Sequence, residues 1–224
     1  ESIHIRAFPN MGKKDMEIYI RDYFTPAMPD FQRQVILFRN TAGKLIATNI
    51  CNHGNIDYNG TGMKGAYLIS SAILPEYQGY GIGQIIGVKL LTGLSPDILF
   101  TTCAQSAALH ARVNLIRKGL VSGYEVYPRL EQKDGKDILI SLPFKELDFV
   151  ISAFRQTYLG VADGLSEEVE HALRGLTIFM VRKNLYREMY DFDPWKKSGR
   201  RDTLAEALGI IKRDGVLVIF RRIT

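Results

Sequence analysis

The sequence of 224 residues is poor in the residue types that bind metals or form disulfides, with two cysteines and four histidines. No Cys-x-x-Cys or His-x-x-x-His pair occurs, so no metal site is expected. Cys51 and Cys103 both lie in apolar runs, which favours two buried, reduced thiols over a disulfide or a catalytic thiol. A chain of this length can bury enough surface to fold without disulfides.

Long hydrophobic runs are also missing. No apolar stretch reaches the ~18 residues that indicate a membrane span, so we expect no membrane attachment. The opening residues Glu1–Arg6 lack the charged and then apolar layout of a signal peptide. We therefore expect a cytoplasmic protein.

A chain-wide excess of positive charge is absent as well. The formal net charge is +5, but residues 1–181 contain equal numbers of acidic and basic residues, so the excess lies in residues 182–224. Its basic pairs are Lys196-Lys197, Arg200-Arg201 and Arg221-Arg222. This region can bind a nucleic acid or an acidic protein, or it can be an ordinary solvated surface. The distribution argues against a uniformly basic nucleic-acid coat.

Hydrophobic periodicity and turn residues predict alternating strands and helices through the first two thirds of the chain. Residues 52–65 are rich in Asn, Asp and Gly and predict a long polar loop. The expected strands are Ile3–Phe8, Gln34–Phe38, Leu45–Cys51, Ala66–Leu74, Ile98–Cys103, and a hairpin of Tyr124–Leu130 and Asp137–Leu142; the expected helices are Met11–Phe24, Gln84–Leu94 and Gln105–Lys118. This order predicts an α/β domain with a mixed sheet over residues 1–144.

The pattern changes after residue 144. Glu146–Leu159 is amphipathic, and Ser166 is a suitable N-cap for a second helix. Residues 176–190 fit a helix and a strand equally well, whereas Asp202–Lys212 predicts a capped helix and Val216–Phe220 an apolar strand. We therefore expect a mainly helical C-terminal extension over residues 145–224, basic at its end.

The segment that carries chemical information is the glycine-rich turn between the strand Ala66–Leu74 and the following helix. Gly79, Gly81 and Gly83 allow consecutive backbone N–H groups to point into one concavity, and the helix start adds unpaired donors and partial positive charge. Such a turn can hold a pyrophosphate without lysines. It can also be only a tight turn. The dinucleotide-binding fingerprint is disfavoured because Gln84 stands where its third glycine would be.

This segment resembles the acetyl-CoA loop of the GCN5-related N-acetyltransferase (GNAT) superfamily. That loop reads Gln/Arg-x-x-Gly-x-Gly/Ala, and Gln78-Gly-Tyr-Gly-Ile-Gly83 matches it, as does the preceding Ile73-Leu-Pro-Glu-Tyr. The resemblance extends over roughly two thirds of the chain and implies a mostly antiparallel sheet flanked by helices. It also implies transfer of an acetyl group from acetyl-CoA to a primary amine in a ternary complex.

The resemblance further implies which residues bind the co-substrate. The loop and the helix start would hold the pyrophosphate of CoA, while the end of the strand would pair with the pantetheine arm. The strands Ala66–Leu74 and Ile98–Cys103 would part to admit the thioester. The implied contacts are Ile73, Leu74, Gln78, Gly79, Tyr80, Gly81, Ile82, Gly83 and Gln84.

The next family signature matches only in part. It reads Asn-x-x-Ala-x-x-Leu-Tyr-x-x-x-Gly-Phe, and counting back from Gly119 puts Ala108 at its Asn and Leu115 at its Tyr. That Tyr is the family's usual proton donor to the leaving thiolate, so the role has no residue here. In an alternative register, Gln105 and Ser106 begin the segment and contact CoA.

Four side chains are candidates for the missing acid or base: His110, Tyr124, Glu125 and His53. For each, an alternative is a role in packing or solvation, and a base that acts through ordered water is a further possibility. The acceptor can be a small molecule or a protein, and a homodimer is possible. The rival hypothesis is a catalytically degenerate module that binds CoA and acts by contact with a protein or a nucleic acid.

Overall fold

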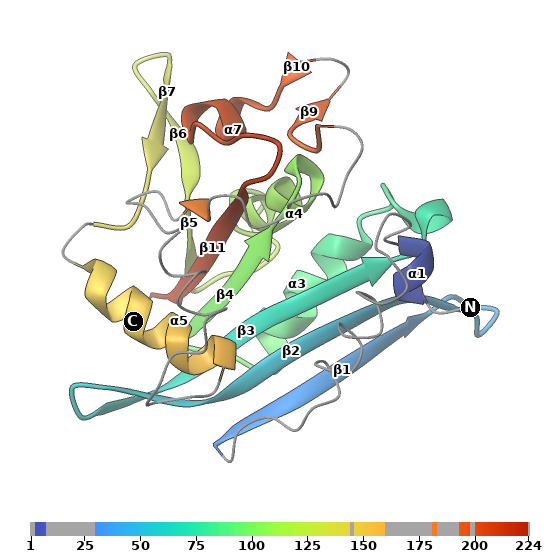
Figure 1. Ribbon diagram of the computed structural model, residues 1–224, viewed down its shortest axis with the longest axis horizontal. Helices are drawn as coiled ribbons and strands as arrows, with labels where there is room; N and C mark the ends of the chain where they lie inside the picture. The colour runs from blue at the N-terminus through green and yellow to red at the C-terminus, as the bar shows by residue number, and fades with distance from the viewer. Residues whose placement is uncertain are drawn as a thin grey trace.

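The computed structural model describes residues 3–7, 30–143, 146–159, 181–182, 193–197 and 200–223. Its helices and strands are drawn in Figure 1. In chain order they are α1 (Ile3–Ala7), β1 (Phe31–Arg39), β2 (Leu45–Tyr58), β3 (Thr61–Ile73), the 3-10 turn η1 (Pro75–Tyr77), α3 (Ile82–Gly93), β4 (Ile98–Cys103), α4 (Ser106–Arg117), β5 (Tyr124–Tyr127), β6 (Arg129–Lys133), β7 (Lys136–Ile140), α5 (Leu147–Leu159), β8 (Val181–Arg182), β9 (Lys196–Lys197), β10 (Arg200–Arg201), α7 (Thr203–Ala207) and β11 (Gly215–Arg222).

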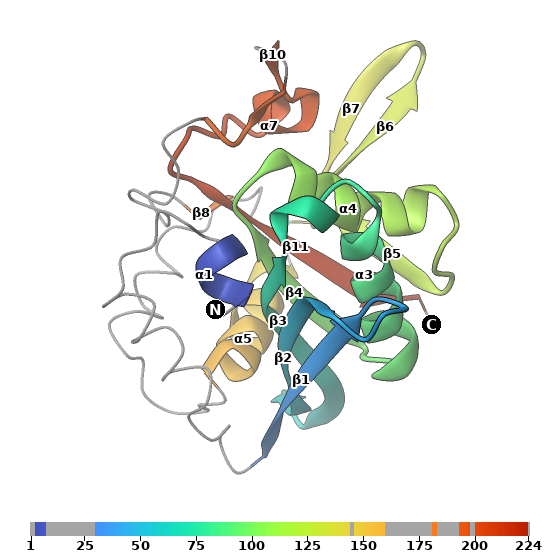
Figure 2. The ribbon, with the colours of Figure 1, turned by 90° about the vertical axis from the view of Figure 1, so that its right-hand side faces the viewer.

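The described residues form a seven-stranded sheet in the order β1-β2-β3-β4-β11-β5, with β8 paired to β11. Only β3 and β4 pair in parallel; the other neighbours are antiparallel. Helices α3 and α4 cover one face, and α1 and α5 lie on the other (Figure 2). The expected mixed, mostly antiparallel sheet flanked by helices is confirmed.

Strand β11 lies in the interior of the sheet, between β4 and β5. Val216 to Arg221 pair with Cys103 to Ile98, and Ile219 to Arg222 pair with Tyr127 to Tyr124. A strand with neighbours on both edges and helices on both faces needs apolar residues throughout, which explains the run Val216–Phe220. The expected strand is therefore present. The sheet crosses the predicted boundary at residue 144, so the extension contributes a strand to the domain.

Two expected elements near the start differ from the structure. Ile3–Ala7 is helical and not a strand. Residues 52–65 are not a polar loop: β2 runs on to Tyr58, and β3 begins at Thr61. Asn59 and Gly60 form the two-residue turn, both with positive φ (53° and 77°), as a tight hairpin requires. Backbone pairing can thus hold a polar segment in strands that its composition does not favour.

The later hairpin also differs from the expectation. The predicted strand Tyr124–Leu130 divides at Pro128, so β5 joins the main sheet while β6 pairs with β7 in a separate ribbon. Asp134 and Gly135, both with positive φ (52° and 75°), form the turn between β6 and β7. The predicted helix Asp202–Lys212 is shorter, since α7 ends at Ala207 and Gly209 takes a positive φ of 62°.

Some expectations fall outside the described residues: the helix Met11–Phe24, the helix beginning at Ser166, and most of residues 176–190. Helix α5 confirms the amphipathic helix expected at Glu146–Leu159. Within the described part of the chain, no helix is both long enough and apolar enough to cross a membrane.

Candidate functional site

Strands β3 and β4 part from each other along their length. Their pairing runs from Gly65 opposite Ile98 to Leu68 opposite Thr101, whereas β3 continues to Ile73. At the parting point β3 has a bulge, because Cys51 of β2 lies opposite Leu68 and Ile50 opposite Ser70, which leaves one extra residue between them. A bulge bends a strand and increases its twist. Beyond the bulge, the edge of β3 that faces β4 is therefore not paired with it; the parted ends of the two strands are called the cleft below.

The glycine-rich turn lies where β3 leads into α3. Gly79 and Gly81 have φ of 86° and 78°, in the left-handed region that favours glycine, and Gly81 is the N-cap of α3. The backbone N–H groups from Gly79 to Gly83 donate to no residue that the structure describes, whereas those of Gln84 and Ile85 donate to the Gly81 carbonyl. Five consecutive donors without a described partner at a helix start are the kind of geometry that can receive an anion.

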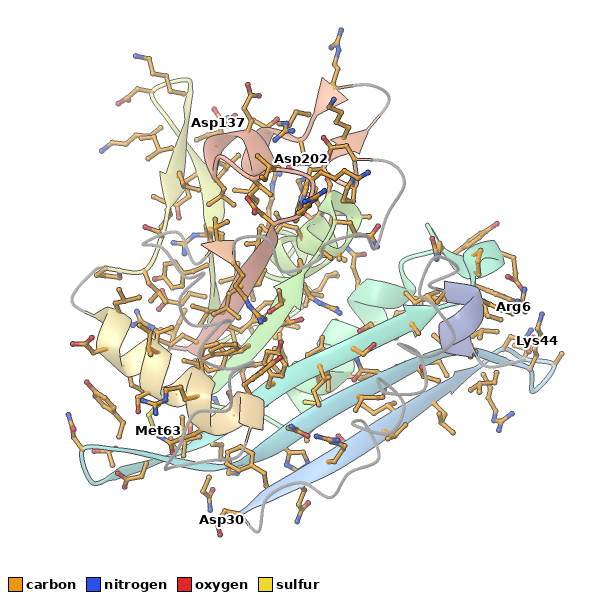
Figure 3. The ribbon with its side chains drawn as sticks, viewed as in Figure 1. Arg6, Asp30, Lys44, Met63, Asp137 and Asp202 are labelled. Carbon is orange, nitrogen blue, oxygen red and sulfur yellow. The ribbon has the colours of Figure 1, made fainter. Side chains whose placement is uncertain are left out.

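Side chains fix this turn to the strand before it. The Gln78 amide donates to the Ile73 carbonyl at 3.1 Å. Glu76, two residues earlier, is paired with Arg6 and Lys44, which Figure 3 labels close together beside the end of the sheet. Their two positive charges neutralise the carboxylate nearest to the turn, so an incoming anion meets little repulsion there.

Helices α3 and α4 approach each other closely behind the turn. A Cβ built on Gly87 would lie 2.4 Å from Leu115 Cδ1, and one on Gly83 would lie 3.5 Å from Ala111 Cβ. Leu115, which stands at the position of the family's Tyr, is buried in this contact. The side chain there is therefore apolar and cannot donate a proton.

A buried polar network lies between α4 and the open part of β3. The Arg112 guanidinium donates to the Gly83 carbonyl at 2.6 Å and to Ser71 Oγ at 3.1 Å. Asn49 also donates to Ser71 Oγ, at 2.9 Å. Arg112 is 5% exposed, and burial lowers its pKa although the nearby Cys103 opposes this. Arg112 Nε and Asn49 Oδ1 have no hydrogen-bond partner among the described residues.

A second group of polar side chains lies on the opposite face of the sheet, also next to the point where β3 and β4 part. The Tyr67 hydroxyl lies 3.2 Å from Thr102 Oγ1, one residue beyond the last pairing of β3 with β4. Arg182 donates to the same Thr102 oxygen at 2.7 Å and stacks over the rings of Phe154 and Tyr158. Burial raises the pKa of Tyr67 to about 12, so its hydroxyl stays protonated at neutral pH.

Two of the four predicted catalytic residues lie at the other end of the sheet. Tyr124 and Glu125 of β5 are level with the beginning of β4, because both neighbour β11 at Arg221 and Arg222. The Tyr124 hydroxyl donates to the Pro96 carbonyl at 2.8 Å. Glu125 accepts from Tyr127 and forms an ion pair with Arg221. Neither is brought to the cleft.

His53 and His110 are also separated from the turn. His53 of β2 lies opposite Ala66 in the closed part of the sheet, and burial lowers its pKa. His110 Nε2 lies 2.5 Å from Asp202 Oδ2, which also accepts from Ser106 Oγ at 2.7 Å. Figure 3 labels Asp202 at the start of α7, above α4. His110 and Ser106 therefore face α7, whereas Ala111, Arg112 and Leu115 face α3.

The predicted co-substrate residues are mostly brought together. Residues 73 and 74 precede the 3-10 turn η1, and residues 78–84 follow it and lead into α3. Gln105, the N-cap of α4, lies two residues after the end of β4 at Cys103. Ser106 is buried, with its amide bound to the Pro194 carbonyl. Sequence reasoning missed Arg112, Ser71 and Tyr67; the one available signal was an arginine on the same helical face as Ala108 and Leu115.

Much of the basic charge is neutralised within the chain. Arg221 pairs with Glu125 and Glu146, and Arg222 with Asp97. Arg201 pairs with Asp193 at 3.2 Å. Intrachain pairing of this kind leaves less charge for an anionic partner. Within the part of the chain that the structure describes, no group of His, Cys, Asp or Glu is arranged to hold a metal ion.

No protein-family model and no curated protein matches the sequence. The structure is similar to a Bacillus subtilis acetyltransferase in complex with CoA, at 9% identity and a TM-score of 0.41, over 100% of this chain and 95% of that chain. It is also similar to Chaetomium thermophilum Naa20 in complex with a bisubstrate analogue, at 15% identity and a TM-score of 0.34, over 58% and 68% of the two chains.

A third likeness is to a Corynebacterium glutamicum protein described as histone acetyltransferase HPA2 and related acetyltransferase, at 13% identity and a TM-score of 0.38, over 61% and 84% of the two chains. TM-scores below 0.5 mark a limited likeness, and fold does not determine function. The function must therefore be argued from the cleft and the turn of this chain.

Proposed function

We propose that the chain is an N-acetyltransferase that moves an acetyl group from acetyl-CoA to a primary amine. The observation that carries this proposal is the parting of β3 from β4 directly beside five free amides at the start of α3. An anion-binding turn joined to an open strand edge suits a ligand that has a pyrophosphate at one end and an extended amide-containing arm at the other.

The pyrophosphate and the extended arm of the ligand would be bound by different kinds of interaction. The amides of Gly79 to Gly83 and the positive end of α3 would bind the pyrophosphate. The arm would lie along β3 as an added strand, with its amides paired to the backbone at Ile73. Leu74 would contact the arm only through its side chain, because its N–H already donates to the Ile46 carbonyl and its carbonyl accepts from Tyr77. Gln78, already bound to the Ile73 carbonyl, would hold the corner between them.

The reaction requires a neutral amine and a polarised thioester carbonyl. In the ternary complex the amine nitrogen attacks the carbonyl carbon, and the electron pair of the carbon–sulfur bond leaves with sulfur. Backbone N–H groups at the bulge, which β4 does not use, would polarise the carbonyl. We assign deprotonation of the amine to water, since the described hydrogen bonds of His110, Tyr124 and Glu125 are made away from the turn. His53 lies beside the part of β3 that is still paired with β4.

A module that binds CoA without transferring acetyl groups is the second candidate. It is favoured by one observation, the buried Leu115 at the position where the family has a proton donor. The acceptor stays a primary amine on a small molecule or a protein. A nucleic-acid partner is not proposed, because Arg201, Arg221 and Arg222 are ion-paired within the chain.

Calorimetry with acetyl-CoA tests whether the chain binds the co-substrate. We expect saturable binding with competition by CoA, and absence of binding at high micromolar ligand would refute both candidates. Release of CoA thiol in the presence of a panel of primary amines then separates them. Amine-dependent release supports the transferase, whereas tight binding with no release from any amine supports the module.

A further inference from the structure

Arg112 is a buried cation with no anionic partner among the residues that the structure describes. Its guanidinium contacts a carbonyl and a hydroxyl and forms no ion pair with any of those residues. Burying an unpaired charge is costly, and the donor at Nε is unused as well. Such a group is typical of a site in which a negative charge is supplied by a ligand or during a reaction.

The position of Arg112 ties it to the cleft. Ser71, its partner on β3, lies beyond the bulge in the part of the strand that β4 has left. Cys103, close enough to act on the Arg112 pKa, is the last residue of β4. The guanidinium is thus enclosed by β3, β4 and the first turn of α3, three residues before Leu115 on the same face of α4.

We propose that Arg112 is a catalytic residue that stabilises the CoA thiolate as it leaves, an inference that rests on the proposed acetyl transfer. The amine nitrogen forms its bond to the carbonyl carbon, the carbon–sulfur bond breaks, and both electrons stay on sulfur. The Arg112 Nε–H donates a hydrogen bond to that sulfur, and its charge balances the new negative charge. The proton lost by the amine goes to water, and the thiolate is protonated after release.

Two other partners fit less well. The pyrophosphate would bind at the free N–H groups of the turn, whereas Arg112 approaches Gly83 from its carbonyl side, within the core. An amide carbonyl of the pantetheine arm would satisfy the Nε donor but would leave the charge without a counterion. A thiolate would accept the hydrogen bond from Nε and would also neutralise the charge of the guanidinium. The other negative charge of the reaction, on the carbonyl oxygen, is assigned to the backbone N–H groups at the bulge.

Stabilisation of a thiolate links CoA affinity to pH. If the bound thiol has a lower pKa than the free thiol, CoA binds more tightly as pH rises toward the free pKa. Acetyl-CoA has no free thiol and serves as the reference for every other titrating group. For the unaltered chain we expect the ratio of CoA to acetyl-CoA affinity to rise about tenfold or more, which is one pKa unit. A ratio that stays flat would overturn the inference while leaving the proposed function intact, and absence of CoA binding would overturn both.

Substitutions of Arg112 test whether this residue causes the rise of the affinity ratio with pH. Arg112→Met should abolish the rise, and Arg112→Lys, which keeps a charge, should retain part of it. Arg117→Met is the matched control, because it removes the same charge from an exposed position on the same helix and should leave the rise unchanged. A rise that persists in folded Arg112→Met would overturn the inference. If that variant does not fold, the affinity ratio of the unaltered chain and of Arg112→Lys over the same pH range still tests the inference.

Discussion

Gly43 and Gly81 share one backbone conformation in different surroundings. Both have φ of +78°; a Cβ on Gly43 would meet nothing within 4 Å, and one on Gly81 would meet only Gln84 Oε1, at 3.8 Å. Gly43 turns the hairpin of β1 and β2, whereas Gly81 lies at the start of α3 among the free amides. The two positions therefore allow backbone strain to be separated from loss of the anion site.

We predict that Gly43→Ala and Gly81→Ala each destabilise the fold by about 1–2 kcal/mol, since alanine disfavours the left-handed region. Only Gly81→Ala should also weaken acetyl-CoA binding, by tenfold or more, because relief of its strain would rotate the amides of the turn. Thermal unfolding and calorimetry on both variants test this. Equal affinities in the two variants would contradict a role for the turn.

The two cysteines give a second prediction at this scale. Cys51 and Cys103 are almost fully buried, and burial raises the pKa of each thiol to about 12. Because the thiolate is the reactive form, neither should react with a disulfide reagent in the folded protein, and both should react after unfolding in urea. Rapid reaction of one thiol in the folded state would show that one of them is exposed and activated.

At the scale of elements, Asp202 joins α7 to α4. One carboxylate oxygen accepts from the amides of Leu204 and Ala205 and so caps α7, and the other accepts from Ser106 and His110 on α4. Burial alone would raise the pKa of Asp202, but the hydrogen bonds from His110, Ser106 and the Ala205 amide outweigh it and hold the pKa well below its usual range.

We predict that Asp202→Ala lowers the free energy of unfolding by about 1–2 kcal/mol through loss of the cap. Asp202→Asn keeps a capping oxygen but removes the charge. Because the folded pKa is depressed, the contribution of the charge is complete above the ordinary pKa of about 3.9 and declines as pH falls below it. Urea denaturation over a pH series should show the difference between the unaltered chain and Asp202→Asn shrinking in acid; a difference that stays constant would contradict this.

Local signals predicted the elements next to the site better than the rest. The apolar run of β3, the glycines of the turn and the helical spacing of α3 are all contained in one short stretch, so they could be read directly. The extension of β2 to Tyr58 could not be read from composition, although Asn59-Gly60 is a typical hairpin signal. Its polar residues are held in strands by pairing with β3, which depends on a partner and not on the segment itself.

The site was predictable only where it depends on backbone geometry. The turn could be inferred from three glycines. The burial of Arg112 could be inferred only from its place on the helical face of Ala108 and Leu115, since an arginine in a helix is ordinarily at the surface. Tyr124 and Glu125 were candidates for the missing acid or base. The register with β11 places them instead at the far end of the sheet. Long-range register of this kind cannot be derived from one sequence.

At the scale of the whole molecule, the central place of β11 predicts that residues 1–144 do not fold alone. Val216 to Phe220 are fully buried. At about 2 kcal/mol for each buried side chain, their loss removes about 10 kcal/mol, comparable with the entire stability of a domain. Fragments 1–144 and 1–214 should both lack a cooperative unfolding transition by circular dichroism, with the full chain as control. A sharp transition in fragment 1–144 would contradict the prediction.

The place of β11 also sets an order of events during translation. Strands β4 and β5 leave the ribosome with their facing edges unpaired, and the strand that fills the space between them follows only after residues 128–214 have been made. At roughly 5–20 residues per second, that interval lasts several seconds. Open strand edges attract other chains. During this interval the facing edges of β4 and β5 can pair with other chains, and the sheet beside the parted ends of β3 and β4 is completed only after β11 has been made.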